Sequence, residues 1–177
     1  MHIIRSNPWG FRIHSPFVYK LVTTGLFRKQ DRREKKIIYP ESFFPVEKKY
    51  TEQILNLIRF LQPVEIVTSG GDNPVHKWII DQSLQQPPEQ VECRDEQSIR
   101  CRRIILSSGL PQVLKPEHSN DVWVMTGMNN KIKRSTLNIS LHQDEVRVIV
   151  ESDFLAILFF HPLLQKEHYI IHRWFYL

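Results

Sequence analysis

Glycine and cysteine are both scarce in this chain. Its 177 residues include six glycines against eleven prolines, a balance that argues against a loose, linker-rich polypeptide. The two cysteines, Cys93 and Cys101, have neither the spacing of a metal site nor the number needed for a disulfide framework. We therefore expect two free thiols in a reducing cytoplasm and no metal centre.

Long hydrophobic runs are also missing. The most apolar stretch, residues 154–160, is far shorter than the ~20 residues that a membrane-spanning helix needs. The N-terminal residues have no apolar segment of the kind found in signal peptides. The sequence therefore predicts a cytoplasmic protein that has no membrane as a partner.

Several signatures of catalysis and metal binding are absent as well. Neither the Gly-x-Ser-x-Gly motif of serine hydrolases nor the phosphate-binding P-loop occurs in the sequence. His161, His168 and His172 are not patterned with carboxylates, so we interpret them as surface or edge histidines rather than metal ligands.

The composition that is present fits one globular domain, with 41% apolar and 24% charged residues. The net charge is +5, and much of it comes from the mostly basic residues 28–36. A basic run of this kind is either a surface for RNA or DNA or a solvated helix end or loop. We favour the solvated segment and keep nucleic-acid binding as an alternative.

Residues 65–80 are the stretch around which the rest is organised. They predict a short buried strand over 65–68, a turn at Ser69, Gly70 and Gly71, and a helix that begins at Pro74. Either Asp72 or Asn73 caps this helix. A strand, glycine turn and helix N-terminus is where α/β proteins bind nucleotide-like ligands, although an ordinary strand-to-helix turn has the same pattern.

Predicted strands and helices alternate through the middle of the chain. The apolar spacing predicts helices over 46–61, 74–85 and 97–106, and strands over 65–68, 90–94, 112–115 and 121–125. Such alternation is typical of βαβ units with a parallel sheet and helices on both faces.

The two ends of the chain depart from this alternation. Residues 1–45 predict a helical N-terminal arm, with one helix from Ser15-Pro16 to Gly25, ahead of an α/β domain over 46–177. Residues 128–145 are polar, with one weak helical candidate over 132–141. Strand-like runs at 146–150, 155–160 and 168–174 then follow too closely for helical crossovers, so at least one antiparallel hairpin is expected.

Four segments carry a resemblance to a known family. They are Gly10-Phe-Arg-Ile-His-Ser-Pro-Phe-Val18, the amphipathic helix 48–61, Asp121-Val-Trp-Val-Met-Thr-Gly127, and the closing strands up to Arg173. Together they resemble class I S-adenosylmethionine-dependent methyltransferases, and in particular a Bacteroidetes group that opens with His-Ser-Pro-Phe-Val. The resemblance implies a three-layer α/β sandwich with a Rossmann-like, mostly parallel sheet, S-adenosylmethionine as cofactor, and a methyl acceptor that the sequence does not identify.

The resemblance also assigns candidate cofactor residues, with departures from the group's pattern. The group's first loop reads Glu-Leu-Gly-Thr-Ser-x-Gly, whereas this chain reads Val-Thr-Ser-Gly-Gly-Asp-Asn over 67–73. The implied contacts with methionine and ribose are Ser69, Gly70, Gly71 and Asp72, the last in place of the lost acid. Asp95 or Glu96 is implied for the ribose hydroxyls, although we favour a solvent-exposed turn for both. Thr126 stands where the group has an aspartate.

The group also has a helix, a fifth strand and another helix where this chain has only residues 128–145. We therefore expect a reduced sheet that lacks one wall of the substrate cleft. Three hypotheses follow: a methyltransferase, whose catalytic residues the sequence does not identify; a non-catalytic pseudoenzyme that serves as a binding or scaffolding module, with a homodimer as its candidate assembly; and a nucleic-acid binder that uses residues 28–36.

Overall fold

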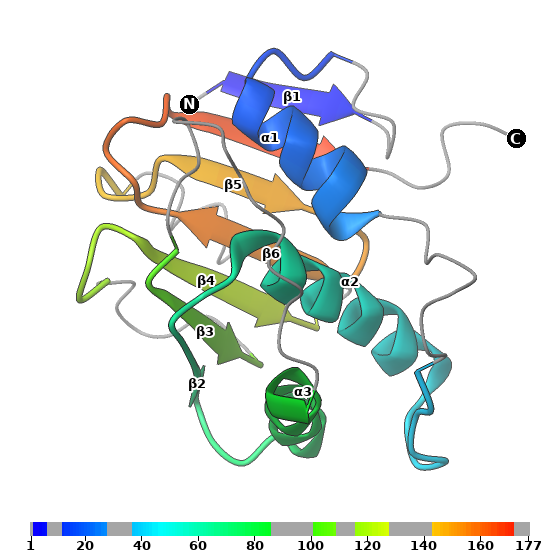
Figure 1. Cartoon of the computed structure of the whole chain (residues 1–177). Helices are drawn as coiled ribbons and strands as arrows, with labels where there is room; N and C mark the ends of the chain where they lie inside the picture. The colour runs from blue at the N-terminus through cyan, green and yellow to red at the C-terminus, as the bar shows by residue number, and fades with distance from the viewer. Residues whose placement is uncertain are drawn as a thin grey trace, which may run out of the picture.

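The computed structural model describes residues 2–6, 12–27, 37–85, 101–108, 116–127 and 143–171. These residues form one seven-stranded sheet in the order β1-β7-β5-β6-β4-β3-β2 (Figure 1). Every pairing is parallel except the two made by β6. The predicted α/β class with a mostly parallel sheet is confirmed. The strands are β1 His2–Ser6, β2 Glu65–Ser69, β3 Arg103–Ser107, β4 Asp121–Thr126, β5 Val148–Glu151, β6 Leu155–Phe159 and β7 Glu167–Ile171.

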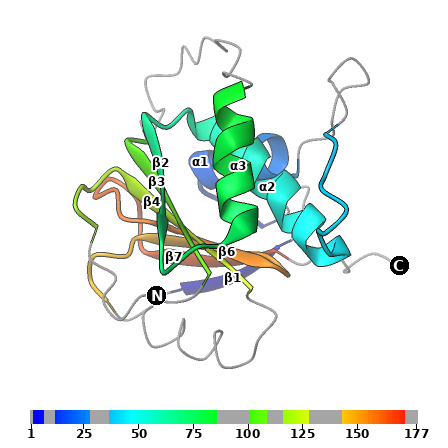
Figure 2. The ribbon, with the colours of Figure 1, turned by 90° about the horizontal axis from the view of Figure 1, so that it is seen from below.

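The described helices cover one face of this sheet, as Figure 2 shows. They are α1 Pro16–Lys20, which continues as the π-helix η1 Leu21–Leu26, then α2 Pro45–Leu61 and α3 Pro74–Gln85. The predicted second layer of helices has no counterpart within the described ranges.

Local sequence sets the ends of these helices. Ser15 caps α1, because its Oγ accepts a hydrogen bond from the Val18 N–H at 3.4 Å. At the start of α2, the Glu47 carboxylate accepts from the Phe44 N–H at 2.7 Å. This helix ends at Gln62, which takes a left-handed conformation with φ 46°, and Pro63 follows.

Both faces of the sheet are apolar and buried over the central strands β3 to β6, whereas β2, which was predicted to be buried, is exposed or half-buried along its length. Alternate strand residues such as Leu106, Val124 and Ile157 pack on the helices, and their neighbours Trp123 and Leu158 form a second buried cluster on the opposite face. Burial on both faces is why the strands read as continuous apolar runs, a pattern that is typical of parallel sheets.

The predicted helix over 97–106 is wrong in its described part. Residues 103–107 form β3, which pairs with β2 and β4. Ile104, Ile105 and Leu106 are all buried, and a short apolar run of this kind does not distinguish a buried strand from a buried helix by its periodicity. The predicted strands at 90–94 and 112–115 and the helix at 132–141 lie outside the described residues.

The N-terminal arm is not wholly helical, because it also contributes a strand. β1 pairs in parallel with β7 at one edge of the sheet, with Ile4 opposite Tyr169. We expected a reduced sheet, but the described sheet has seven strands. Two of them, β1 and β3, come from segments that were predicted to be helical.

The closing strands confirm the predicted antiparallel hairpin. β5 and β6 pair antiparallel, with Val148 opposite Phe159, and β7 pairs with β5 in parallel. The interpretation of His168 as a surface or edge histidine is wrong. This residue is 1% exposed, because β7 is flanked by both β1 and β5.

Candidate functional site

The carboxyl ends of the parallel strands β2, β3 and β4 lie at one edge of the sheet. Their register places Ser69 opposite Ser107 and Ser107 opposite Met125. The turn after β2 and Thr126 at the end of β4 therefore belong to the same edge, which is where α/β proteins bind their ligands.

The turn after β2 is open to a ligand at its backbone. Gly70 has φ 93° and Gly71 has φ 104°, conformations that favour glycine over every residue with a Cβ. A Cβ built on Gly71 would have no atom within 4 Å, and one on Gly70 would meet only Ser107 Oγ, at 4.0 Å. Both glycines and Asp72 are exposed.

Asn73, not Asp72, is the cap of α3. Its Oδ1 accepts hydrogen bonds from the N–H groups of Val75 at 2.9 Å and His76 at 3.3 Å. The alternative between Asp72 and Asn73 is thereby resolved, and the exposed Asp72 carboxylate has no capping role.

A histidine that the sequence did not single out joins this turn to β4. Nε2 of His76 lies 3.1 Å from Oγ1 of Thr126, although the two residues are 50 positions apart in the chain. Thr126 Oγ1 donates to the carbonyl oxygen of Ser107 at 3.3 Å. Because a hydroxyl has one hydrogen, Thr126 accepts its bond from His76, and Nε2 carries the imidazole proton.

This contact is buried and uncharged. His76 is 1% exposed and Thr126 is 3% exposed. Burial lowers the pKa of His76 to about 4, so its imidazole is neutral at pH 7. The end of β4 therefore presents a neutral, buried hydroxyl whose single hydrogen is already bonded to the Ser107 carbonyl oxygen. Neither residue supplies a negative charge to a cation.

The structure brings together five of the seven candidate cofactor residues. Ser69, Gly70, Gly71 and Asp72 form the turn after β2, and Thr126 ends β4 at the same edge. Asp95 and Glu96 lie outside the described residues, and so does the basic run 28–36. His76 was missed because a histidine on a helix with an apolar face carries no distinguishing motif.

The position of β2 differs from that of the first strand in the doubly wound order. There the first strand lies inside the sheet, beside the point where the strand order reverses. Here β2 lies at the edge of the described sheet and pairs with β3 alone, and β2, β3 and β4 follow one another in chain order. No reversal point lies beside the glycine turn among the described strands.

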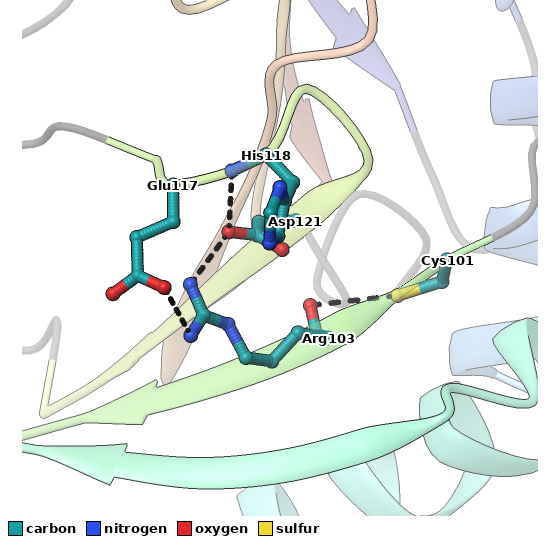
Figure 3. A network of polar contacts seen from close by, with 5 residues as sticks. All are labelled: Cys101, Arg103, Glu117, His118 and Asp121. Atoms are coloured by element: carbon teal, nitrogen blue, oxygen red, sulfur yellow. Dashed lines mark hydrogen bonds and ion pairs between the residues drawn. The ribbon is translucent and has the colours of Figure 1, made fainter.

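A charged network lies at the opposite, amino end of β3 and β4 (Figure 3). The guanidinium of Arg103 contacts Asp121 at 2.8 Å and Glu117 at 2.9 Å, and Asp121 also accepts from the His118 N–H at 3.1 Å. Because Arg103 and Asp121 stand opposite each other in the register, this network ties two strands together far from the glycine turn. We assign it a structural role.

Cys101 lies beside this network and is a free, buried thiol. Its Sγ contacts the carbonyl oxygen of Arg103 at 3.6 Å. Burial, reinforced by the nearby Asp121 carboxylate, raises the pKa of the thiol to about 12. The thiol is therefore protonated at neutral pH and is a poor nucleophile. Cys93 lies outside the described residues.

A second buried histidine pairs with a carboxylate between β5 and β7. His168 Nε2 lies 3.2 Å from Glu151 Oε2, and Nδ1 of His168 is buried without a hydrogen-bond partner among the described residues. The two side chains lie on the face of the sheet that the described helices do not cover, whereas His76 and Thr126 meet on the helical face. They are therefore not part of the same site.

Comparisons with known proteins found no counterpart: no protein-family model, no curated protein and no solved structure matches this chain. Within the described ranges, no group of three or more His, Cys, Asp and Glu residues is arranged to hold a metal ion. None of the helices in these ranges is both long and apolar enough to cross a membrane.

Proposed function

We propose that this chain is a methyltransferase-like protein that binds S-adenosylmethionine at the turn between β2 and α3 and has lost the methyl-transfer step. One observation carries the proposal: the glycine turn and the end of β4 share one edge of the sheet, joined by the His76–Thr126 hydrogen bond of 3.1 Å. The resemblance of the sequence to class I methyltransferases names the ligand.

The open turn supports the binding half of the proposal. Exposed glycines with positive φ let a ligand approach the backbone closely. Asp72 offers an exposed carboxylate that is suited to ligand hydroxyl or amino groups.

The neutral end of β4 supports the loss of transfer. Methyl transfer depends mainly on holding the sulfonium methyl in line with an acceptor. Here the end of β4 carries a buried threonine bonded to a buried histidine, so Thr126 offers an acceptor neither a negative charge nor an exposed group. We therefore expect the protein to act as a binding or scaffolding module for its ligand.

Calorimetric titration tests binding. We expect saturable heat at S-adenosylmethionine concentrations up to about 5 mM. Such millimolar affinity requires a binding free energy of only about −4 kcal/mol. Asp72→Asn should weaken binding at least about ten-fold, the usual effect of losing one hydrogen bond to a charged group. Asp81→Asn is the matched control, because Asp81 is also an exposed aspartate but lies within α3, away from the turn. This variant should bind as the wild type does.

Two results contradict the proposal in different ways. Absence of saturable heat for the wild-type chain rejects the binding half. Transfer of a radiolabelled methyl group to any acceptor, at a rate above that of the free cofactor, rejects the loss of catalysis and returns the chain to the methyltransferases.

A further inference from the structure

β2 lies at one edge of the described sheet (Figure 1), and among the described strands it pairs with β3 alone. Leu106 of β3 is fully buried on the helical face, whereas Thr68, which stands opposite it in the register, is exposed. The described helices therefore cover β3 but stop short of the outer side of β2. This edge of the sheet is open to a further strand.

The backbone of β2 offers hydrogen-bonding groups at this edge. The Glu65 N–H donates to the carbonyl oxygen of Arg102 at 3.2 Å, so the backbone groups of Glu65 are directed at β3. Because this direction alternates along a strand, the N–H and C=O groups of Ile66 and Thr68 are directed outward. No described residue hydrogen-bonds to these outward groups.

We infer that β2 is a homodimer interface, at which the strands of two copies pair antiparallel across a two-fold axis at Val67 and join the two sheets into one. The inference is independent of the proposed ligand. Full overlap of the five-residue strand with its copy sets the register. It places Ile66 opposite the partner's Thr68, Val67 opposite the partner's Val67, and Glu65 opposite the partner's Ser69.

This register matches the groups that the edge presents. The outward backbone groups of Ile66 and Thr68 meet those of the partner's Thr68 and the partner's Ile66, which gives about four hydrogen bonds. The half-buried Val67 meets an apolar side chain, and the Glu65 carboxylate meets a hydroxyl donor. Each side chain of the strand therefore meets a compatible one in a second copy of the same strand.

The composition of β2 also favours pairing. Its central residues Ile66, Val67 and Thr68 are all β-branched, a type that packs well on a pleated surface. The strand contains no proline or lysine, and its register with β3 is not interrupted by a bulge. These are the features that usually protect an edge strand from pairing. A closed two-fold dimer covers this edge and leaves no further copy of it exposed.

Sedimentation of the full chain tests the dimer. One pair of short strands is a small interface, so the mass should rise toward that of a dimer only as the concentration increases from micromolar to millimolar. Thr68→Pro removes an outward N–H at a position where an edge strand tolerates proline, and it should stay monomeric. Thr68→Val keeps the N–H and is the matched control, which should dimerise as the wild type does.

Cross-linking with oxidised glutathione tests the register. Val67→Cys should form a disulfide-linked dimer, because facing residues of a non-hydrogen-bonded antiparallel pair have Cα atoms about 4.5 Å apart, within the range of a disulfide. Glu65→Cys is the control. It is the more exposed position, but its two copies would be four residues out of register, roughly 13 Å apart. It should not link to itself, whereas a mixture of Glu65→Cys and Ser69→Cys should link.

The outcomes separate the dimer from its register. A wild-type chain that stays monomeric at millimolar concentration overturns the inference. A dimer that survives in Thr68→Pro places the interface elsewhere and also overturns it. If Thr68→Pro does not fold, the cysteine variants decide: linking of Glu65→Cys as fast as Val67→Cys would show random collision and not strand pairing.

Discussion

At the scale of single residues, the two buried polar contacts of β4 differ in charge: Arg103–Asp121 is an ion pair, whereas His76–Thr126 is neutral. The Asp121 side chain is wholly buried and contacts the Arg103 guanidinium directly, whereas Glu117 on the same guanidinium is 71% exposed and adds little. His76 has no such counterion in its contact with Thr126. The buried imidazole therefore stays neutral, and protonating it in acid destabilises the fold.

We predict that His76 makes the protein less stable in acid. Its folded-state pKa of about 4 is lower than the ordinary value of 6.5, so the unfolded chain binds the proton more readily. The stability that depends on neutral His76 is complete above about pH 6.5 and is lost as pH falls toward 4. The full loss is on the order of 3 kcal/mol.

Urea unfolding between pH 7.5 and 4 measures this effect. His76→Gln should have a flatter pH profile than wild type over that interval, even where its stability at pH 7 is lower. His118→Gln controls for replacing an exposed histidine. Parallel profiles for wild type and His76→Gln would contradict the prediction.

At the scale of elements, α2 carries local strain at its C-terminal end. Gln62 takes φ 46° while its N–H donates to the Ile58 carbonyl oxygen at 2.9 Å. A side chain with a Cβ is disfavoured in this conformation, and glycine is the residue that usually takes it. Gln62 is exposed, so its side chain makes little contribution to the core.

Replacing Gln62 by glycine should therefore raise the free energy of unfolding by about 0.5–1 kcal/mol. Gln62→Ala keeps the Cβ and is the matched control, with stability close to wild type. Urea midpoints for the three chains give the comparison. Gln62→Gly at or below the stability of Gln62→Ala would show that the left-handed cap is not a source of strain.

The same elements show how far the sequence predicts the fold. The helices at α2 and α3, the strands β2 and β4 and the β5–β6 hairpin follow from apolar spacing and from Pro45, Pro63 and Pro74 at or beside helix ends. β3 was missed because its apolar run is short and buried on both faces. β1 was missed because its pairing with β7 joins segments over 160 positions apart, as with His2 opposite Glu167.

The candidate site was also predictable only in part, because local patterns specify its turn but not its long-range contact. Ser69 to Asp72 follow from a local pattern of strand, glycine turn and proline. The partner of Thr126 is set by the position of α3 over the sheet, which no local pattern specifies. A buried histidine on α3 and a threonine 50 residues later become one contact only in three dimensions.

At the scale of the whole molecule, the first residues of the chain close one edge of the sheet. β1 adds to β7, and its side chains alternate between the two faces. Ile4 is 8% exposed and belongs to the core on the helical face, whereas its neighbour Ile3 is 55% exposed on the other face. These two isoleucines therefore form a matched pair that differs only in burial.

We predict that Ile4→Ala lowers the free energy of unfolding by about 2–3 kcal/mol, because it removes buried methyl groups and leaves a cavity beside Tyr169. Ile3→Ala should cost less than about 1 kcal/mol. Urea unfolding measures both changes, and hydrogen exchange at the amides of β7 reports whether β1 still protects its neighbour. Equal losses for the two substitutions would mean that β1 is not docked by its inward face. In that case β7 would be the outermost stable strand of the sheet, and β1 would not contribute to the stability of the core.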